Sequence, residues 1–357
     1  MRKPRNRVCA LRPVGYNAPT MKPSSSWKTI SVLVLLLVAL SVSGAPQSVE
    51  ATARSAAFCD SVSQIPTVEC QALVDLYNST GGASWTNRSD WLATSTPCSW
   101  YGVNCYGGHV YRIILNYNGL SGTLPASLGS LAGLRNLVLQ SNQLSGGIPD
   151  SVGNLASLEE LSLAHNQLSG DIPASLGNLR ILRQVHLYNN NLSGGIPASL
   201  GNLPSLRGLY LHSNALSGNI PGSLGNIASL EELDLADNQL SGGIPDSLGN
   251  LAHLQTLLVD NNGLTGAVPD SLTGLANLMA LTVDHNLLSG ALPTGLKNLP
   301  LTYFYFDATN LCEPLEAGFQ EWLAGIPYLR RTGVFCGNPT FKHRVRIPIA
   351  MRIRTAQ

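Results

Sequence analysis

Apolar and polar positions follow a pattern that recurs every 24 residues through the middle of the chain. Asparagine marks the period at Asn118, Asn142, Asn166, Asn190, Asn214, Asn238, Asn262, Asn286 and Asn310. Columns of leucine, glycine and proline keep the same step, two, four and seven residues after most of these asparagines. So regular a repeat predicts a solenoid in which each copy stacks on the next.

The apolar positions of a single copy predict how the copies stack. The copy around Asn142 has an apolar set made of Leu134, Leu137, Leu139, Leu144, Ile148, Val152 and Leu155. One copy cannot bury these side chains alone, whereas stacked copies enclose them in a continuous core. The alternation over residues 137–139 predicts one short strand of a parallel sheet in each copy. The asparagine amide is expected to pair with backbone groups that burial would otherwise leave without partners.

The repeat unit reads L-x-x-L-x-L-x-x-N-x-L-S-G-x-I-P-x-S-L-G-N-L, which resembles the plant-type leucine-rich repeat. The resemblance implies an α/β solenoid, a right-handed superhelix with a parallel β-sheet on its concave face and disulfide-linked caps at both ends. The chain is similar in this respect to the ectodomains of plant leucine-rich repeat receptors and to polygalacturonase-inhibiting proteins. The asparagines from Asn118 to Asn286 would then form a structural ladder.

Composition shifts along the chain predict five segments. These are a signal peptide or leader at 1–53, an N-terminal cap at 54–109, repeats at 110–300, a C-terminal cap at 301–338 and a basic tail at 339–357. In the leader, the apolar run at residues 30–42 has the length of a signal-peptide core, and Ala51, Thr52 and Ala53 offer a cleavage site. Cleavage would give a secreted or cell-surface protein without a membrane span, whereas an uncleaved leader would be an anchor.

Six of the seven cysteines flank the repeats, and none lies inside them, which favours disulfide-linked caps in an oxidising compartment. The run from Cys98 to Cys105 is similar to the N-terminal cap of secreted leucine-rich repeat proteins. That resemblance implies a Cys98–Cys105 disulfide and leaves Cys59 to pair with Cys70. Trp85, Trp91 and Trp100 in this segment are interpreted as a cover for the first repeat, with a ligand site as the alternative.

The C-terminal cap is predicted to contain an amphipathic helix over residues 313–326. Its apolar face would carry Leu315, Phe319, Trp322, Leu323 and Ile326. Cys312 and Cys336 bracket this helix and are expected to pair. The basic tail beyond it could form an edge strand, a solvated tail or a contact with an acidic surface.

Charge and motifs narrow the function. Between residues 115 and 300, Asp and Glu outnumber Lys and Arg by 12 to 5, which argues against binding nucleic acid. The sequence contains no G-x-S-x-G, no H-E-x-x-H and no phosphate-binding loop. We therefore predict no catalytic residue, no metal site and no cofactor, and the pattern indicates no particular oligomeric state.

Residues that point away from the core carry the information on partners. In the strand segments, the outward positions form a patch of His186, Tyr188, Tyr210 and His212 and an acidic strip of Asp234, Asp237, Asp260 and Asp284. Exposed tyrosines on a rigid sheet fit a recognition hot spot, and an ordinary polar face is the alternative. The acidic strip is consistent with a solvated face, with a basic partner or calcium, or with glycosidase-like catalysis, which an open sheet disfavours.

These observations predict a non-catalytic extracellular protein that binds another protein, or an extended polysaccharide, through the concave face. Two other functions remain open at this point. One is a structural, adhesin-like surface protein held by its basic tail, and the other is a carbohydrate-active enzyme that uses the acidic strip.

Overall fold

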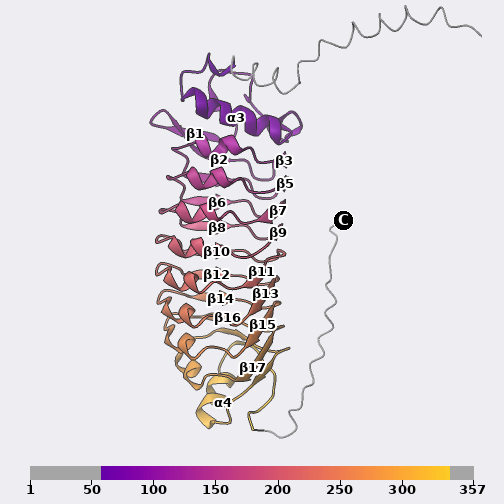
Figure 1. Cartoon of the computed structure of the whole chain (residues 1–357), viewed down its shortest axis with the longest axis vertical. Coiled ribbons are helices and arrows are strands. Elements are labelled where there is room, and N and C mark those ends of the chain that lie inside the picture. Colours follow the sequence, from indigo (N-terminus) through magenta and orange to yellow (C-terminus); the bar gives the residue numbers. More distant parts are fainter. Residues whose placement is uncertain (1–57, 338–357) are drawn as a thin grey trace, which may run out of the picture. The chain divides into compact units, whose positions relative to one another are not determined.

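The structure is a computed structural model that describes residues 58–337, and the predicted leader and the basic tail lie outside them. A single 11-stranded sheet runs through the stack of repeats, and we call it the main sheet (Figure 1). Its strands from β2 to β20 are parallel, with the β1–β2 hairpin at one end. The strands are β1 (Val103–Tyr106), β2 (His109–Ile114), β4 (Asn136–Val138), β6 (Glu160–Ser162), β8 (Gln184–His186), β10 (Gly208–Tyr210), β12 (Glu232–Asp234), β14 (Thr256–Leu258), β16 (Ala280–Thr282), β18 (Tyr303–Tyr305) and β20 (Tyr328–Arg330).

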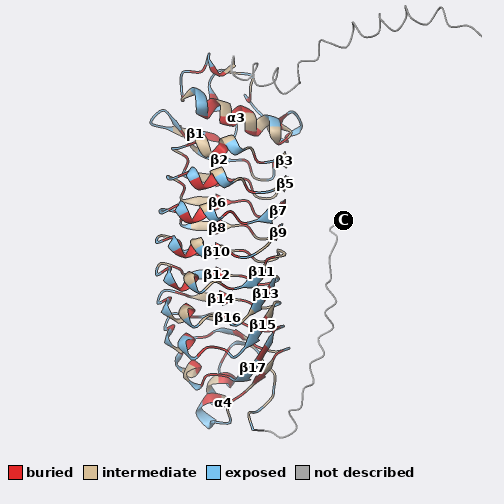
Figure 2. Cartoon of the chain, in the orientation of Figure 1, coloured by how far each residue is buried: buried red, intermediate tan, exposed pale blue. Residues whose placement is uncertain are grey.

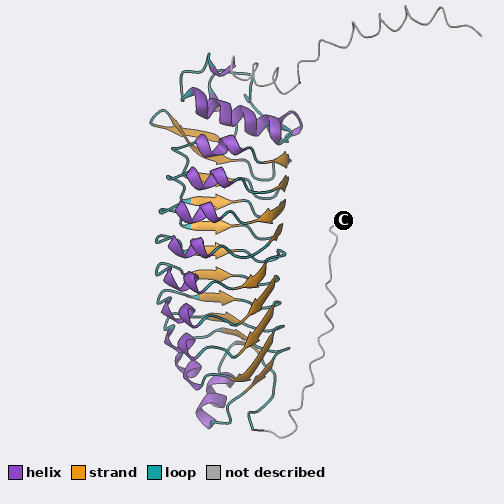
Figure 3. Cartoon of the chain, in the orientation of Figure 1, coloured by secondary structure: helices purple, strands orange, loops and turns teal. Residues whose placement is uncertain are grey.

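Each repeat returns through a second short strand and a 3-10 turn, which Figure 3 shows as separate columns. The second strands form one sheet of β3 (Ser121–Thr123), β5 (Gln143–Gly146), β7 (Gln167–Asp171) and β9 (Asn191–Ser193), and another of β11 (Ser217–Asn219), β13 (Gln239–Gly242), β15 (Gly263–Gly266), β17 (Leu287–Ala291) and β19 (Asn310–Cys312). The 3-10 turns of the repeats span Ala126–Ser130, Asp150–Asn154, Ala174–Asn178, Ala198–Asn202, Gly222–Asn226, Asp246–Asn250, Asp270–Gly274 and Thr294–Asn298. The chain therefore has the predicted leucine-rich repeat architecture.

The core is a column of aliphatic side chains between these layers. Figure 2 colours the buried residues red along the ribbon. Leu137, Leu139 and Leu144 are fully buried, and so are their counterparts in the neighbouring repeats. The glycine near the end of the 3-10 turn is required by close stacking. A Cβ atom on Gly177 would lie 2.4 Å from the carbonyl oxygen of Ser199 in the next repeat, so a larger residue would force the two copies apart.

The asparagine column joins neighbouring repeats through buried hydrogen bonds. Asn190 donates from Nδ2 to the carbonyl oxygens of Leu163, Leu187 and Tyr188, at 3.1, 3.0 and 3.3 Å. Its Oδ1 accepts a hydrogen bond of 3.0 Å from the amide of Leu168 in the preceding repeat. The ladder thus satisfies backbone groups that the turn of the chain leaves unpaired.

Asn310 keeps the 24-residue step of the sequence but does not join this ladder. The residue before each ladder position has a positive φ, and in the last copy that residue is Ala308, with φ 49°. Thr309 therefore takes the ladder position, 23 residues after Asn286, and its Oγ1 donates to the Phe306 carbonyl at 2.7 Å. Asn310 instead begins β19. Because this copy has one residue fewer, the aromatic residues of β18 are shifted by one position relative to the 24-residue period of the sequence.

The N-terminal cap is closed by α3 (Thr67–Ser79), the short turns Gly82–Ser84 and Pro97–Ser99, and the disulfides Cys59–Cys70 and Cys98–Cys105. Trp85, Trp91 and Trp100 are buried at the end of the repeat core, and each indole N–H donates to a backbone carbonyl. The three indoles therefore cover the first repeat, and because they are buried they offer no surface to a ligand.

The C-terminal cap contains α4 (Ala317–Ala324) and the disulfide Cys312–Cys336. The helix is shorter than the predicted span of residues 313–326. Glu313 lies before it, fully buried, and Leu315 is 68% exposed rather than part of the apolar face. Glu313 forms an ion pair with Arg331 and a parallel β-bridge with Phe335 before the helix begins. Within residues 58–337, no helix combines the length and apolar character needed to cross a membrane.

Candidate functional site on the main sheet

The outward face of the main sheet carries the predicted aromatic patch. We use this term for His186, Tyr188, Tyr210 and His212. His186 and Tyr210 occupy the same position in the paired strands β8 and β10, and Tyr188 and His212 follow those strands two residues later. All four side chains are half-buried, so each has one surface against its neighbours and one toward solvent. The fold therefore brings together four residues that come from two adjacent repeats.

The four rings form two stacked pairs across neighbouring strands. The ring centroids of His186 and Tyr210 are 4.6 Å apart at an interplanar angle of 7°, and those of Tyr188 and His212 are 4.4 Å apart at 14°. These spacings match the strand spacing of a sheet, about 4.8 Å, because residues in register stack directly. His165 adds an edge contact to Tyr188 at 5.1 Å. Stacking holds the rings in one arrangement, so little entropy remains to be lost on binding.

Gly208 and Glu232 position Tyr210. A Cβ atom on Gly208 would lie 2.6 Å from Cε2 of Tyr210, so the ring occupies the space that any larger residue would take. Burial, the hydrogen bond from the phenol to the Glu232 carboxylate, and the nearby carboxylates raise the pKa of Tyr210 above its usual range. The phenol is therefore a neutral donor at any physiological pH. Sequence reasoning treated Gly208 and Glu232 as ordinary outward positions, and only the tertiary contacts reveal their effect on Tyr210.

The two histidines differ in their surroundings. His212 Nδ1 lies 2.8 Å from Asp234 Oδ2, an approach that forms an ion pair when the imidazole is protonated but is not aligned as a hydrogen bond. His186 has no such contact. Burial lowers the pKa of His186 below its ordinary value of 6.5, against the opposing effect of Glu160 and Glu232.

We expect His186 to titrate below pH 6.5 in an NMR titration of its imidazole resonances. Because its folded-state pKa is depressed, the unfolded state binds the proton more readily. The stability that His186 contributes is thus present above pH 6.5 and is lost as the pH falls through the folded-state pKa. His186→Gln assigns the resonance and should weaken this acid dependence of unfolding. A titration midpoint at or above 6.5 would contradict the burial argument.

The acidic strip is not the continuous exposed surface that the sequence predicted. Asp234, Asp237 and Asp260 are at least partly exposed, but Asp284 is only 1% exposed, so the prediction that it lies on the surface is wrong. Its Oδ2 accepts hydrogen bonds of 2.8 Å from both His285 and Arg330. Arg330 comes from β20 of the C-terminal cap and also stacks 4.1 Å above the ring of Tyr305. At this end of the strip, the charge of Asp284 is therefore neutralised by Arg330, a contact that sequence spacing alone did not indicate.

Burial raises the pKa of Asp284, and the hydrogen bond from His285 together with the charge of Arg330 opposes that shift. Across the part of the chain that the structure describes, no three His, Cys, Asp or Glu side chains are grouped so that they could hold a metal ion. The acidic strip is thus a surface of three carboxylates available to a cationic group of a partner.

Three models of known families match the chain, over four segments. The leucine rich repeat model matches residues 108–168 and 180–240, and a further leucine rich repeat model matches residues 253–275. The leucine rich repeat N-terminal domain matches residues 67–106. Together these matches cover more than half of the chain. The chain is a leucine-rich repeat protein of the plant type.

Solved structures similar to this chain include plant receptor ectodomains. The ectodomain of the Arabidopsis thaliana receptor kinase GASSHO1/SCHENGEN3, in complex with CASPARIAN STRIP INTEGRITY FACTOR 2, is 39% identical, with a TM-score of 0.61 over 63% of this chain and 28% of that one. The Arabidopsis receptor kinase HAESA, in complex with the peptide hormone IDA and the co-receptor SERK1, is 34% identical, with a TM-score of 0.59 over 68% and 42% of the two chains.

A plant ice-binding protein is 27% identical, with a TM-score of 0.60, and the match covers 78% of this chain and 97% of that protein. The present chain spans less than half the length of the two receptor ectodomains. It shares their repeat architecture, and this family and fold are typically those of non-catalytic binding domains.

Proposed function

We propose that this protein is a non-catalytic extracellular binding protein that recognises another protein or a peptide through the main sheet, with the aromatic patch at the centre of the contact. The observation that carries the proposal is the pair of stacks His186–Tyr210 and Tyr188–His212. Four rings held on adjacent strands offer a large contact area at a small cost in side-chain entropy. The leader would deliver the protein to the cell exterior or surface.

The chemistry of the patch fits a polypeptide partner. Rings with one polar edge accept apolar side chains on their faces and backbone groups at their hydroxyl and imidazole atoms. Asp234 and Asp237 lie on the next repeat and give the surface an acidic border that would attract a basic side chain. Ectodomains of the same architecture are known in complex with peptide hormones and a co-receptor, which supports a peptide or protein partner. The polysaccharide alternative gains no such support.

The test is capture of extracellular proteins on immobilised chain comprising residues 54–357, followed by affinity measurement with the purified partner. The variant with Tyr188→Ala and Tyr210→Ala removes one ring from each stack. A matched control carries Tyr303→Ala and Tyr328→Ala, because these rings also stack across adjacent strands of the same sheet, at 4.4 Å and 5°. Each hot-spot ring contributes about 2 kcal/mol, so the patch variant should bind at least about thirtyfold more weakly.

Equal affinity of the patch variant and the parent would overturn the assignment of the patch. A greater loss in the control than in the patch variant would move the contact to the C-terminal end of the main sheet. Both variants should still unfold in one cooperative transition, since the substituted rings lie outside the buried leucine core. Retention on cells that depends on residues 339–357, without any captured partner, would favour the adhesin-like alternative.

A further inference from the structure

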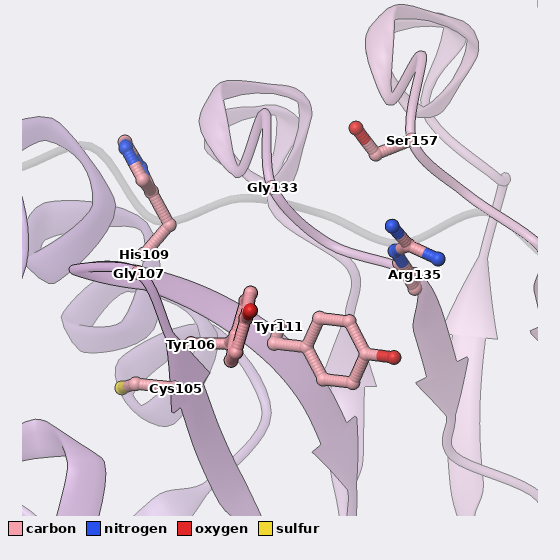
Figure 4. A pocket seen from close by; sticks show the side chains of 8 residues that line it. All are labelled: Cys105, Tyr106, Gly107, His109, Tyr111, Gly133, Arg135 and Ser157. Atoms are coloured by element: carbon pink, nitrogen blue, oxygen red, sulfur yellow. The ribbon is translucent and has the colours of Figure 1, made fainter.

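A pocket lies beside the N-terminal end of the main sheet, away from the aromatic patch (Figure 4). It is a cavity of about 710 Å³ between the β1–β2 hairpin and the first two repeats, which is the size of a small-molecule site. Its walls come from Tyr106, His109 and Tyr111 of the hairpin and from Gly133, Arg135 and Ser157 of the following repeats. None of these residues belongs to the surface argued for the protein partner.

The walls of this pocket are fixed by specific contacts. Gly107 and Gly108 have φ of 60° and 80° and turn the hairpin beside Tyr106. Glu69 of α3, which is buried, accepts hydrogen bonds from the Val110 amide at 2.8 Å and pairs with His109 Nδ1 at 2.6 Å. The hairpin is thereby held against the cap helix, and the pocket keeps its width without a ligand.

Tyrosine rings form the floor of the pocket, and a guanidinium group lies at one side. Figure 4 shows Tyr106 and Tyr111 side by side below Gly133, with Arg135 beside the ring of Tyr111. The two ring centroids are 6.0 Å apart with the ring planes tilted by 56°, and the guanidinium carbon of Arg135 is 5.5 Å from the ring of Tyr111. Tyr106 is 79% exposed, so its ring is accessible to a ligand.

Arg135 keeps hydrogen-bonding capacity for a ligand. Its Nη1 donates to Glu159 in the next repeat, and no acceptor for Nε or Nη2 is present within residues 58–337. Arg112 also lies over the ring of Tyr111, at 5.0 Å, but its Nε donates to Asn136 and it is not among the residues that line the pocket. One guanidinium group beside an accessible tyrosine ring fits a planar group that joins a ring to a carboxylate, because the ring stacks on tyrosine while the carboxylate takes paired N–H donors.

We propose that this pocket binds an aromatic carboxylate, in which a flat ring lies on the exposed face of Tyr106 and the carboxylate faces Arg135. Two sources share this chemistry: a free aromatic acid, and an aromatic residue at the C-terminus of a peptide. The site is independent of the aromatic patch, so each of the two proposals stands or fails alone.

The test is isothermal titration or NMR of the full chain with phenylacetate and with its neutral analogue phenylacetamide. The pocket should bind phenylacetate, which is a small ligand, with a dissociation constant in roughly the millimolar range. The amide should bind at least about tenfold more weakly, since it lacks the charge that pairs with guanidinium. A short peptide that ends in phenylalanine is tested in the same way, as its free acid and as its amide. Comparing the affinities of the peptide acid and of phenylacetate shows which of the two sources the pocket prefers.

Arg207→Gln is the matched control for Arg135→Gln. Arg207 occupies the same repeat position, and its Nη1 makes the same type of ion pair, 3.0 Å from Glu231, but it does not line the pocket. We expect Arg135→Gln to lower phenylacetate affinity about tenfold and Arg207→Gln to leave it unchanged. Tyr106→Ala, a surface change, should weaken both acid and amide. Absence of saturable binding, equal affinity for acid and amide, or equal loss in the two arginine variants would overturn the proposal.

Discussion

Asn190→Ala should lower the free energy of unfolding by roughly 3 kcal/mol or more. The substitution removes three donor contacts and one acceptor contact to backbone groups of two repeats. Each buried group left without a partner costs about 1–3 kcal/mol, and the interior of the stack leaves little room for water to replace the amide. Urea unfolding followed by far-UV circular dichroism measures the change.

Asn178→Ala is the control for that variant. Asn178 ends the 3-10 turn of the preceding repeat, is exposed, and within the described residues makes no side-chain hydrogen bond. Its replacement should change stability by about 0.5 kcal/mol or less. Hydrogen exchange should in addition show the repeats on either side of Asn190 opening first, since each copy is held only by its neighbours. Coincident unfolding curves for the two variants would contradict the role given to the ladder.

Glu313→Ala should destabilise the C-terminal cap by about 3–5 kcal/mol, the usual effect of removing one partner of a buried ion pair. Glu313 is fully buried, and its Oε1 accepts hydrogen bonds from Arg331 Nε at 3.0 Å and from the Gly333 amide at 2.9 Å. Without the carboxylate, Arg331 and this amide lose their main partner. Limited proteolysis between Glu313 and Cys336, together with thermal unfolding, detects the loss.

Two further variants locate the effect. Glu316→Ala removes a carboxylate three residues away that pairs with Lys297 in solvent, so it should cost about 1 kcal/mol or less. The double variant Glu313→Ala and Arg331→Met should recover part of the stability, because it no longer buries an unpaired charge. If the double variant were as unstable as the sum of its single changes, the ion pair would not be the cause.

The repeat pattern was sufficient for the architecture. A period of 24 residues with fixed leucine, asparagine and glycine columns leaves one way to bury every apolar side chain, so the main sheet and its core positions follow from local spacing. The aromatic patch could be predicted for the same reason, since residues at equal offsets in adjacent copies must stack at the strand spacing. In the last copy the structural period is one residue shorter than the asparagine spacing, and Thr309 rather than Asn310 takes the ladder position.

Contacts between residues far apart in the sequence were decided only by the tertiary structure. No local pattern indicates that Arg330 neutralises Asp284 or that Glu69 holds the hairpin beside the pocket. Periodicity fixes which side of a strand a residue faces. Which charge or ring meets it there depends on how the caps, which have no period, close over the ends of the stack.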